Sequence, residues 1–200
     1  MNQISGTAAA VLLAATPLTT LASICTPPND HSITDWTQCA DDPYTGYERY
    51  IGYGMFETRV EDAWNYCQRL QSFYNTPGTM NLVSIPASDM DTCVNNLLVT
   101  VSTQPGTDYP ATASLGAQYY NSTDLWAWAD GDHVMKSSGD YNSCLNVDAN
   151  GICQPMDGQK CLIATVDNGQ YYWDTYSCLD SHVNFMCEYS CNPAGPTHSC

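Results

Sequence analysis

The chain has 200 residues, of which 21 are Asp or Glu and five are Lys or Arg, so its formal net charge is −16. A chain this acidic cannot displace counterions from phosphates, which excludes a nucleic-acid binder, and it argues against docking on an anionic membrane surface. The length suits a single domain, and a hydrophobic content of 44% is enough for a packed core.

The cysteine count and the first residues indicate an extracellular protein. Eleven cysteines point to an oxidising compartment, because disulfides persist in secreted proteins. Residues 8–15 (AAAVLLAA) are too short to span a bilayer but are typical of a signal-peptide centre, with small residues near Ser23 for cleavage. We expect a signal peptide over residues 1–23 and secretion without membrane insertion. No Lys or Arg precedes the apolar run, so a flexible leader is the alternative.

Residues 24–45 have neither a helical nor an alternating period, and we expect an irregular acidic lead-in there. The spacing of apolar residues then predicts a helix over 59–73, which Thr58 and Glu61 would begin as a capping box. Asn75 to Gly78 should end this helix. Residues 82–85 read as a short strand that Pro86 stops.

Ser88 is predicted to cap a second helix that has Asp91 at its third position and an apolar face that continues to Val101. Strands follow over 114–120 and 125–128, and a polar stretch over 132–159 reads as a long loop. Residues 160–166 and 170–175 form a predicted hairpin through Asn168-Gly169. A last strand covers 184–189, so the order of elements indicates an α+β fold.

The aromatic residues of these strands have two interpretations. We expect Trp126, Trp128 and Trp173 to fill the core rather than stack on a sugar. Of the pairs 119–120 and 171–172, both Tyr-Tyr, one ring each should lie outside, because neighbouring residues on a strand face opposite sides. Asn121 begins an Asn-Ser-Thr glycosylation sequon, for which chance occurrence is the alternative.

Several segments, taken in order, resemble the C-type lectin-like domain. They are EDAWNYC (61–67), NLVSI (81–85), LWAWADG (125–131), YWD (172–174) and FMCE (185–188). SLGA (114–117) stands where the family carries Trp-Ile-Gly-Leu, so the Trp and Ile are replaced by Ser and Leu. The resemblance covers residues 46–190 and implies two helices flanking antiparallel sheets with a long loop. Residues 191–200 then form a cysteine-containing tail.

The resemblance also implies two disulfides, Cys67–Cys187 and Cys161–Cys178. Pairing cannot be deduced from spacing alone. For the remaining cysteines we expect the pairs Cys144–Cys153, Cys25–Cys39 and Cys191–Cys200. This leaves Cys93 on the second helix, either as a buried free thiol or as an intermolecular bridge.

In the sugar-binding members of that family, the long loop and the following strand hold a calcium ion that the sugar hydroxyls also coordinate. Calcium requires six to eight oxygen ligands. The positions that correspond to the family's ligands, or lie beside them, are Gln154, Asp157, Gln159, Asp174 and Thr175. Met156 replaces one ligand by a thioether, a poor donor for a hard cation. The favoured interpretation is therefore a loop that has kept its shape and lost its ion, with at most a small effect of calcium on stability. The alternative is a calcium site formed by Gln154, Asp157 and Asp174, with Asp148 as another candidate.

These expectations favour a secreted, non-catalytic recognition protein that binds a glycan or an extracellular protein. The alternative is a structural extracellular protein that assembles through this domain, as a disulfide-linked or self-assembled oligomer. No cofactor other than calcium is indicated. We expect no enzyme activity, because the acids are spread over loops and the four histidines lack partners at zinc-binding spacing.

Overall fold

The structure is a computed structural model that describes residues 26–34, 36–39, 41, 46–86, 88–104, 110–120, 125–128, 160–179 and 183–191. The predicted leader, the sequon, the loop over 132–159 and the tail after residue 191 lie outside these residues. The described helices are α1 (Val60–Tyr74) and α2 (Ser88–Ser102). The strands are β1 (Thr37–Gln38), β2 (Arg49–Thr58), β3 (Thr79–Leu82), β4 (Ala111–Tyr120), β5 (Leu125–Trp128), β6 (Cys161–Asp167), β7 (Gln170–Tyr176) and β8 (Val183–Ser190).

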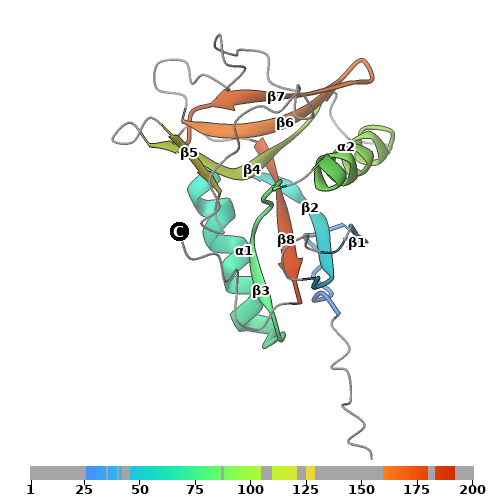
Figure 1. The fold of residues 1–200 in the computed structure, drawn as a ribbon, viewed down its shortest axis with the longest axis vertical. Coiled ribbons are helices and arrows are strands. Elements are labelled where there is room, and N and C mark those ends of the chain that lie inside the picture. The colour runs from blue at the N-terminus through green and yellow to red at the C-terminus, as the bar shows by residue number, and fades with distance from the viewer. Residues whose placement is uncertain are drawn as a thin grey trace, which may run out of the picture.

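The strands form one sheet in the order β1-β2-β8-β4-β6-β7, with β3 on β8 and β5 on β4. Every described pairing is antiparallel except β4 with β8, where Ala113 lies opposite Asn184 in a parallel register. Figure 1 shows α1 alongside β3 and β8, whereas α2 lies on the other side of β4. This arrangement confirms the α+β class. No described helix is long and apolar enough to cross a membrane.

Strand β2 is absent from the sequence prediction, although it pairs with β8 from Arg49 opposite Ser190 to Gly54 opposite Phe185. Its run Ile-Gly-Tyr-Gly weakens the alternation on which strand prediction depends. The glycines are needed for packing rather than for turns. A Cβ at Gly52 would collide with Ile33, and one at Gly54 would collide with the Phe185 ring.

The predicted capping box of Thr58 and Glu61 at the start of α1 is wrong. Arg59 is the N-cap and no side chain caps the helix, because Thr58 is still the last residue of β2, where it lies opposite Val183. The predicted end is confirmed. Asn75 adopts a left-handed conformation with φ of 49°, and its N–H donates to the carbonyl of Gln71.

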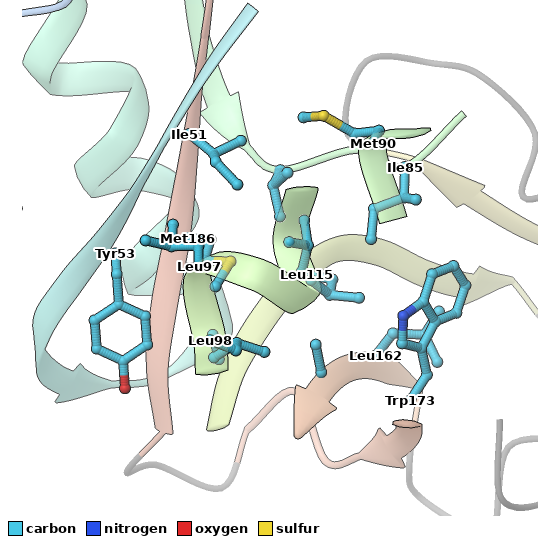
Figure 2. Packing of buried hydrophobic residues seen from close by; sticks show 14 of the residues in the cluster. Ile51, Tyr53, Ile85, Met90, Leu97, Leu98, Leu115, Leu162, Trp173 and Met186 are labelled. Atoms are coloured by element: carbon cyan, nitrogen blue, oxygen red, sulfur yellow. The ribbon is translucent and has the colours of Figure 1, made fainter. Parts of the chain in front are cut away.

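Two hydrophobic clusters form the core. The larger lies between α2 and strands β4, β6 and β7, and Figure 2 shows Leu98, Leu115, Leu162 and Trp173 within it. The smaller lies between α1, β3 and β8 and contains Phe185. Each of the three tryptophans predicted to fill the core is at most 3% exposed, which confirms that prediction: Trp126, Trp128 and Trp173.

A buried ion pair connects strands β2 and β8. Arg49 on β2 donates through Nε to Glu188 Oε1 at 2.8 Å, and its Nη2 lies 2.6 Å from Glu188 Oε2. The same two side chains also bind the backbone of Ser84, whose N–H donates to Glu188 and whose carbonyl accepts from Arg49. The segment after β3 is thereby held against β2 and β8.

The structure contains the disulfides Cys67–Cys187 and Cys161–Cys178, as the resemblance implies. The first joins α1 to β8. The second joins the start of β6 to the residues after β7.

The expected pair Cys25–Cys39 is wrong, because Cys39 is bonded to Cys93 with a Cα–Cα distance of 5.8 Å. Cys93 is therefore neither a free thiol nor an intermolecular bridge. Cys191 is also disulfide-bonded, to a cysteine outside the described residues. The expected pair Cys144–Cys153 lies outside them entirely.

The lead-in is more ordered than predicted. Ile33 forms an isolated bridge with Gly54, and β1 pairs with β2 through Thr37 opposite Ile51. The Trp36 indole packs edge-on against Tyr189, with ring centroids 6.5 Å apart. Polar composition hid this order, because the contacts are made with residues distant in sequence.

Candidate functional site

Strand β7 carries the residues that correspond to ligands in the resembling family. It ends the strand order of the described sheet and pairs with β6 through the turn at Asn168 and Gly169, both at positive φ. Its side chains alternate between two rows. Tyr171, Trp173 and Thr175 form the inner row, opposite core residues of β6, and Tyr172, Asp174 and Tyr176 form the outer row.

The inner row is bound to α2 through one carboxylate. Tyr171 Oη donates to Asp91 Oδ1 at 2.6 Å, and Trp173 Nε1 donates to the same oxygen at 3.1 Å. Trp173 Nε1 also lies 2.8 Å from Tyr171 Oη. These bonds connect a helix to a strand some 80 residues later, so Asp91 fixes the position of β7.

Burial shifts the pKa of both titratable groups in this network. Desolvation raises the pKa of Asp91 above its usual value of 3.8, while the hydrogen bonds from Tyr171 and Trp173 act in the opposite direction. Burial, and then the charge of Asp91, raise the pKa of Tyr171 well above its usual value of 10.0. Tyr171 therefore stays protonated and remains a donor.

Two further contacts hold β7 in place. Trp173 packs perpendicular to Trp128 of β5, with ring centroids 5.9 Å apart. The Cys161–Cys178 disulfide closes the other end of the strand, where Tyr176 lies opposite Cys161. The strand is thus fixed at several points, which favours a rigid platform for the outer row.

Asp174 is the carboxylate of the outer row. It is half-buried, and its Oδ1 accepts the Thr175 N–H at 2.8 Å. Burial, together with the charges of Asp167 and Asp174, raises the pKa of Tyr172. Asp174 therefore presents a negative charge beside an aromatic hydroxyl on a fixed strand.

The described residues do not by themselves supply a calcium shell. The Thr175 side chain is 2% exposed and belongs to the inner row, so the structure does not bring it to the face of Asp174. No group of three or more His, Cys, Asp or Glu suited to a metal occurs among the described residues. The other predicted ligands lie outside them: Gln154, Asp157 and Gln159.

The role of Asp91 differs from the one that its position predicts, because an acid at the third position of a helix is typical of a helix start. The spacing of Asp91 from the apolar residues of α2 could have indicated this role. Asp91 is three residues before Val94 and seven before Leu98, so it lies on the apolar face of α2. A carboxylate on such a face requires buried donors, and the aromatic pair on β7 supplies them.

No protein-family model matches the sequence, and no curated protein matches it. Solved structures are similar in fold. The carbohydrate-recognition domain of the mouse scavenger receptor C-type lectin is 19% identical, with a TM-score of 0.50, and the match covers 78% of this chain and 94% of that one.

Two further solved structures are also similar to this chain in fold. The C-type lectin CEL-I from Cucumaria echinata is 16% identical, with a TM-score of 0.53 and coverage of 82% of this chain and 100% of that one. The C-type lectin domain of murine dendritic cell inhibitory receptor 2, in complex with an N-glycan, is also 16% identical, with a TM-score of 0.50 and coverage of 78% and 97%. At these identities the similarity establishes the fold.

Proposed function

Because the chain has the C-type lectin fold, we propose that it is a secreted, non-catalytic recognition protein that binds a glycan or an extracellular protein. The observation that carries the proposal is the outer row of β7, where Asp174 stands between two tyrosines on a strand held from behind by Asp91. A rigid surface with one acceptor-only carboxylate and neighbouring aromatic rings suits ligands that offer hydroxyl or amide donors.

The disulfides support secretion. Three are formed between described residues, and they connect α1 to β8, α2 to the residue after β1, and β6 to the residues after β7. Such bonds persist in oxidising compartments.

The proposal does not depend on calcium, but a calcium ion could contribute to ligand binding. Asp174, with Gln154 and Asp157 from the loop, would hold the ion, and the ion would offer its free positions to sugar hydroxyls. With Met156 at a ligand position and Thr175 on the inner row, we expect weak calcium binding.

The test is a glycan array with calcium and with a chelator, run on the unmodified protein, Asp174→Ala and the matched control Asp167→Ala. Binding that Asp174→Ala weakens and Asp167→Ala does not would support the proposal. Binding that both variants retain would place the ligand elsewhere on the domain.

Size-exclusion chromatography distinguishes the structural alternative. A recognition protein should elute at one small size with and without calcium. Large species that a reductant dissolves, together with an array that shows no binding, would favour an assembly role.

A further inference from the structure

A pocket of about 410 Å³ opens where the first turns of α1 pass β4. Its base is formed at a register shift between β4 and β6, so that Leu115 to Ala117 have no partner on β6. The Cys161–Cys178 disulfide and the side chain of Leu179, which is 72% exposed, complete the apolar part of the lining. This volume lies within the range of about 300–1,000 Å³ that is typical of small-ligand sites.

The pocket lies apart from the ligand positions on β7. Its described lining contains neither Asp174 nor either of the two tyrosines beside it. Strand β6 lies between β4 and β7 in the sheet. A ligand in the pocket would therefore bind without Asp174, the candidate calcium ligand among the described residues.

Four side chains give the pocket its chemistry. Trp64 contributes an aromatic ring, Glu61 a carboxylate, and Asn65 and Gln118 amides. Glu61, Trp64 and Asn65 share one face of α1, because residues three and four apart are neighbours on a helix. No side-chain hydrogen bond or ion pair connects Glu61, Asn65 or Gln118 with another described residue. Their polar groups are therefore available to a ligand.

We propose that this pocket is a second recognition site, which binds a non-acidic saccharide unit without calcium. An indole offers an apolar surface to the C–H face of a sugar ring. A carboxylate accepts hydrogen bonds from hydroxyls, and amides both donate and accept, which matches adjacent hydroxyls of a saccharide.

The charge of the pocket excludes acidic sugars. None of its described lining residues is Lys, Arg or His, and Glu61 carries the charge of that lining. The chain as a whole has a net charge of −16. Sialylated or sulfated sugars would meet like charge, whereas neutral and amino sugars would not.

The inference rests on the proposed recognition function, and its test separates the two. An array of neutral, amino and acidic oligosaccharides is probed in chelator with the unmodified protein and four variants. Glu61→Gln removes the carboxylate at constant size, and Asp62→Asn makes the same charge change one residue away on an exposed position that does not line the pocket. Asn65→Trp fills the pocket mouth, and Ser72→Trp places the same ring two turns later.

We expect chelator-resistant binding to neutral or amino sugars. Glu61→Gln should weaken it about tenfold, because a charge-assisted hydrogen bond becomes a neutral one. Asn65→Trp should abolish it, whereas Asp62→Asn and Ser72→Trp should leave it unchanged. Melting curves of each variant check folding. If Asn65→Trp does not fold, the pair Glu61→Gln and Asp62→Asn still decides the question.

Three outcomes would overturn the inference. They are chelator-resistant binding that Glu61→Gln leaves intact, binding to acidic sugars alone, and no binding in chelator. If binding then returns with calcium and is lost in Asp174→Ala, the proposed function stands without the second site. If no condition gives binding, the glycan-binding form of the proposed function fails as well.

Discussion

The hydroxyl of Tyr171 donates a 2.6 Å hydrogen bond to Asp91, and this contact joins α2 to the strand that carries Asp174. Trp173 donates to the same carboxylate oxygen from two residues further along. Two donors of β7 thus share one acceptor from a helix. The position of the candidate binding strand is coupled to α2 through a single side chain.

Asp91→Ala should destabilise the protein by about 1–3 kcal/mol, because it removes the acceptor of the largely buried Tyr171 hydroxyl and one of the acceptors of the Trp173 indole N–H. Asp91→Asn keeps the Oδ1 acceptor and should cost less than Asp91→Ala at neutral pH. Urea denaturation of the two variants with disulfides intact measures both costs. Equal losses in both would show that the contact with Tyr171 and Trp173 depends on the charge.

The pH dependence of Asp91 has a defined sign. Burial raises its pKa in the folded state above the usual value of 3.8, so the folded protein keeps this proton to higher pH than the unfolded chain does. The contribution of Asp91 to stability is therefore fully present below pH 3.8 and declines as pH rises through the raised pKa.

The free energy of unfolding of the unmodified protein minus that of Asp91→Asn should therefore decrease from pH 3.5 towards pH 7. Subtraction removes the contributions of the other acids. A difference that increases with pH would contradict the assigned direction of the pKa shift.

Arg49 and Glu188 form a buried pair, 2% and 12% exposed in their side chains, that also satisfies the backbone of Ser84. Removal of one partner leaves the other charge buried and uncompensated, so Arg49→Met or Glu188→Leu should each cost about 3–5 kcal/mol. The double variant should cost much less than the sum of the two. A double-mutant cycle by urea denaturation measures this, and additive costs would show that the pair is not coupled.

The Cys39–Cys93 bond closes a loop with a sequence separation of 54. Loop-closure entropy predicts a loss of about 4 kcal/mol when both cysteines are replaced by alanine. Peptide mapping of the unreduced protein should recover this bond together with Cys67–Cys187 and Cys161–Cys178. Alkylation of Cys93 without prior reduction would contradict the pairing.

The sequence predicted the elements whose signals are local. The helical spacing of α1, the Asn168-Gly169 hairpin and the tryptophans of β5 and β7 are all confirmed. The two disulfides inferred from family resemblance are confirmed as well.

What the sequence missed depends on contacts between distant residues. Strand β2 has glycines where side chains of Ile33 and Phe185 approach, so its pattern is weak. Cys39, just after β1, pairs with Cys93 on α2 at a sequence separation of 54, and spacing cannot reveal such a pairing. The inward orientation of Thr175 follows from the register of β7 on β6, and it changes the expected ligand set.

Calcium should stabilise the protein only slightly. A ligand that binds the folded state alone adds RT ln(1 + [L]/Kd), so a site with a Kd near 0.1 mM would add about 2.7 kcal/mol in 10 mM calcium. Here Thr175 faces the core and Met156 offers a thioether, which leaves Asp174 as the one ligand position among the described residues. We expect a gain well under 1 kcal/mol at millimolar calcium, measured as a shift of the melting temperature.

Variants test which oxygens matter for that shift. Met156→Asn adds an amide oxygen and should enlarge the calcium-dependent shift if the loop follows the family geometry. Thr175→Asp should destabilise the calcium-free protein, because it places a carboxylate at a position that is 2% exposed. Asp167→Ala is the control for Asp174→Ala, since it removes the same charge at the other end of the hairpin. A large shift in the unmodified protein, abolished by Asp174→Ala and retained in Asp167→Ala, would contradict weak binding. It would mean that Asp157 or Asp148 of the loop completes the shell around Asp174.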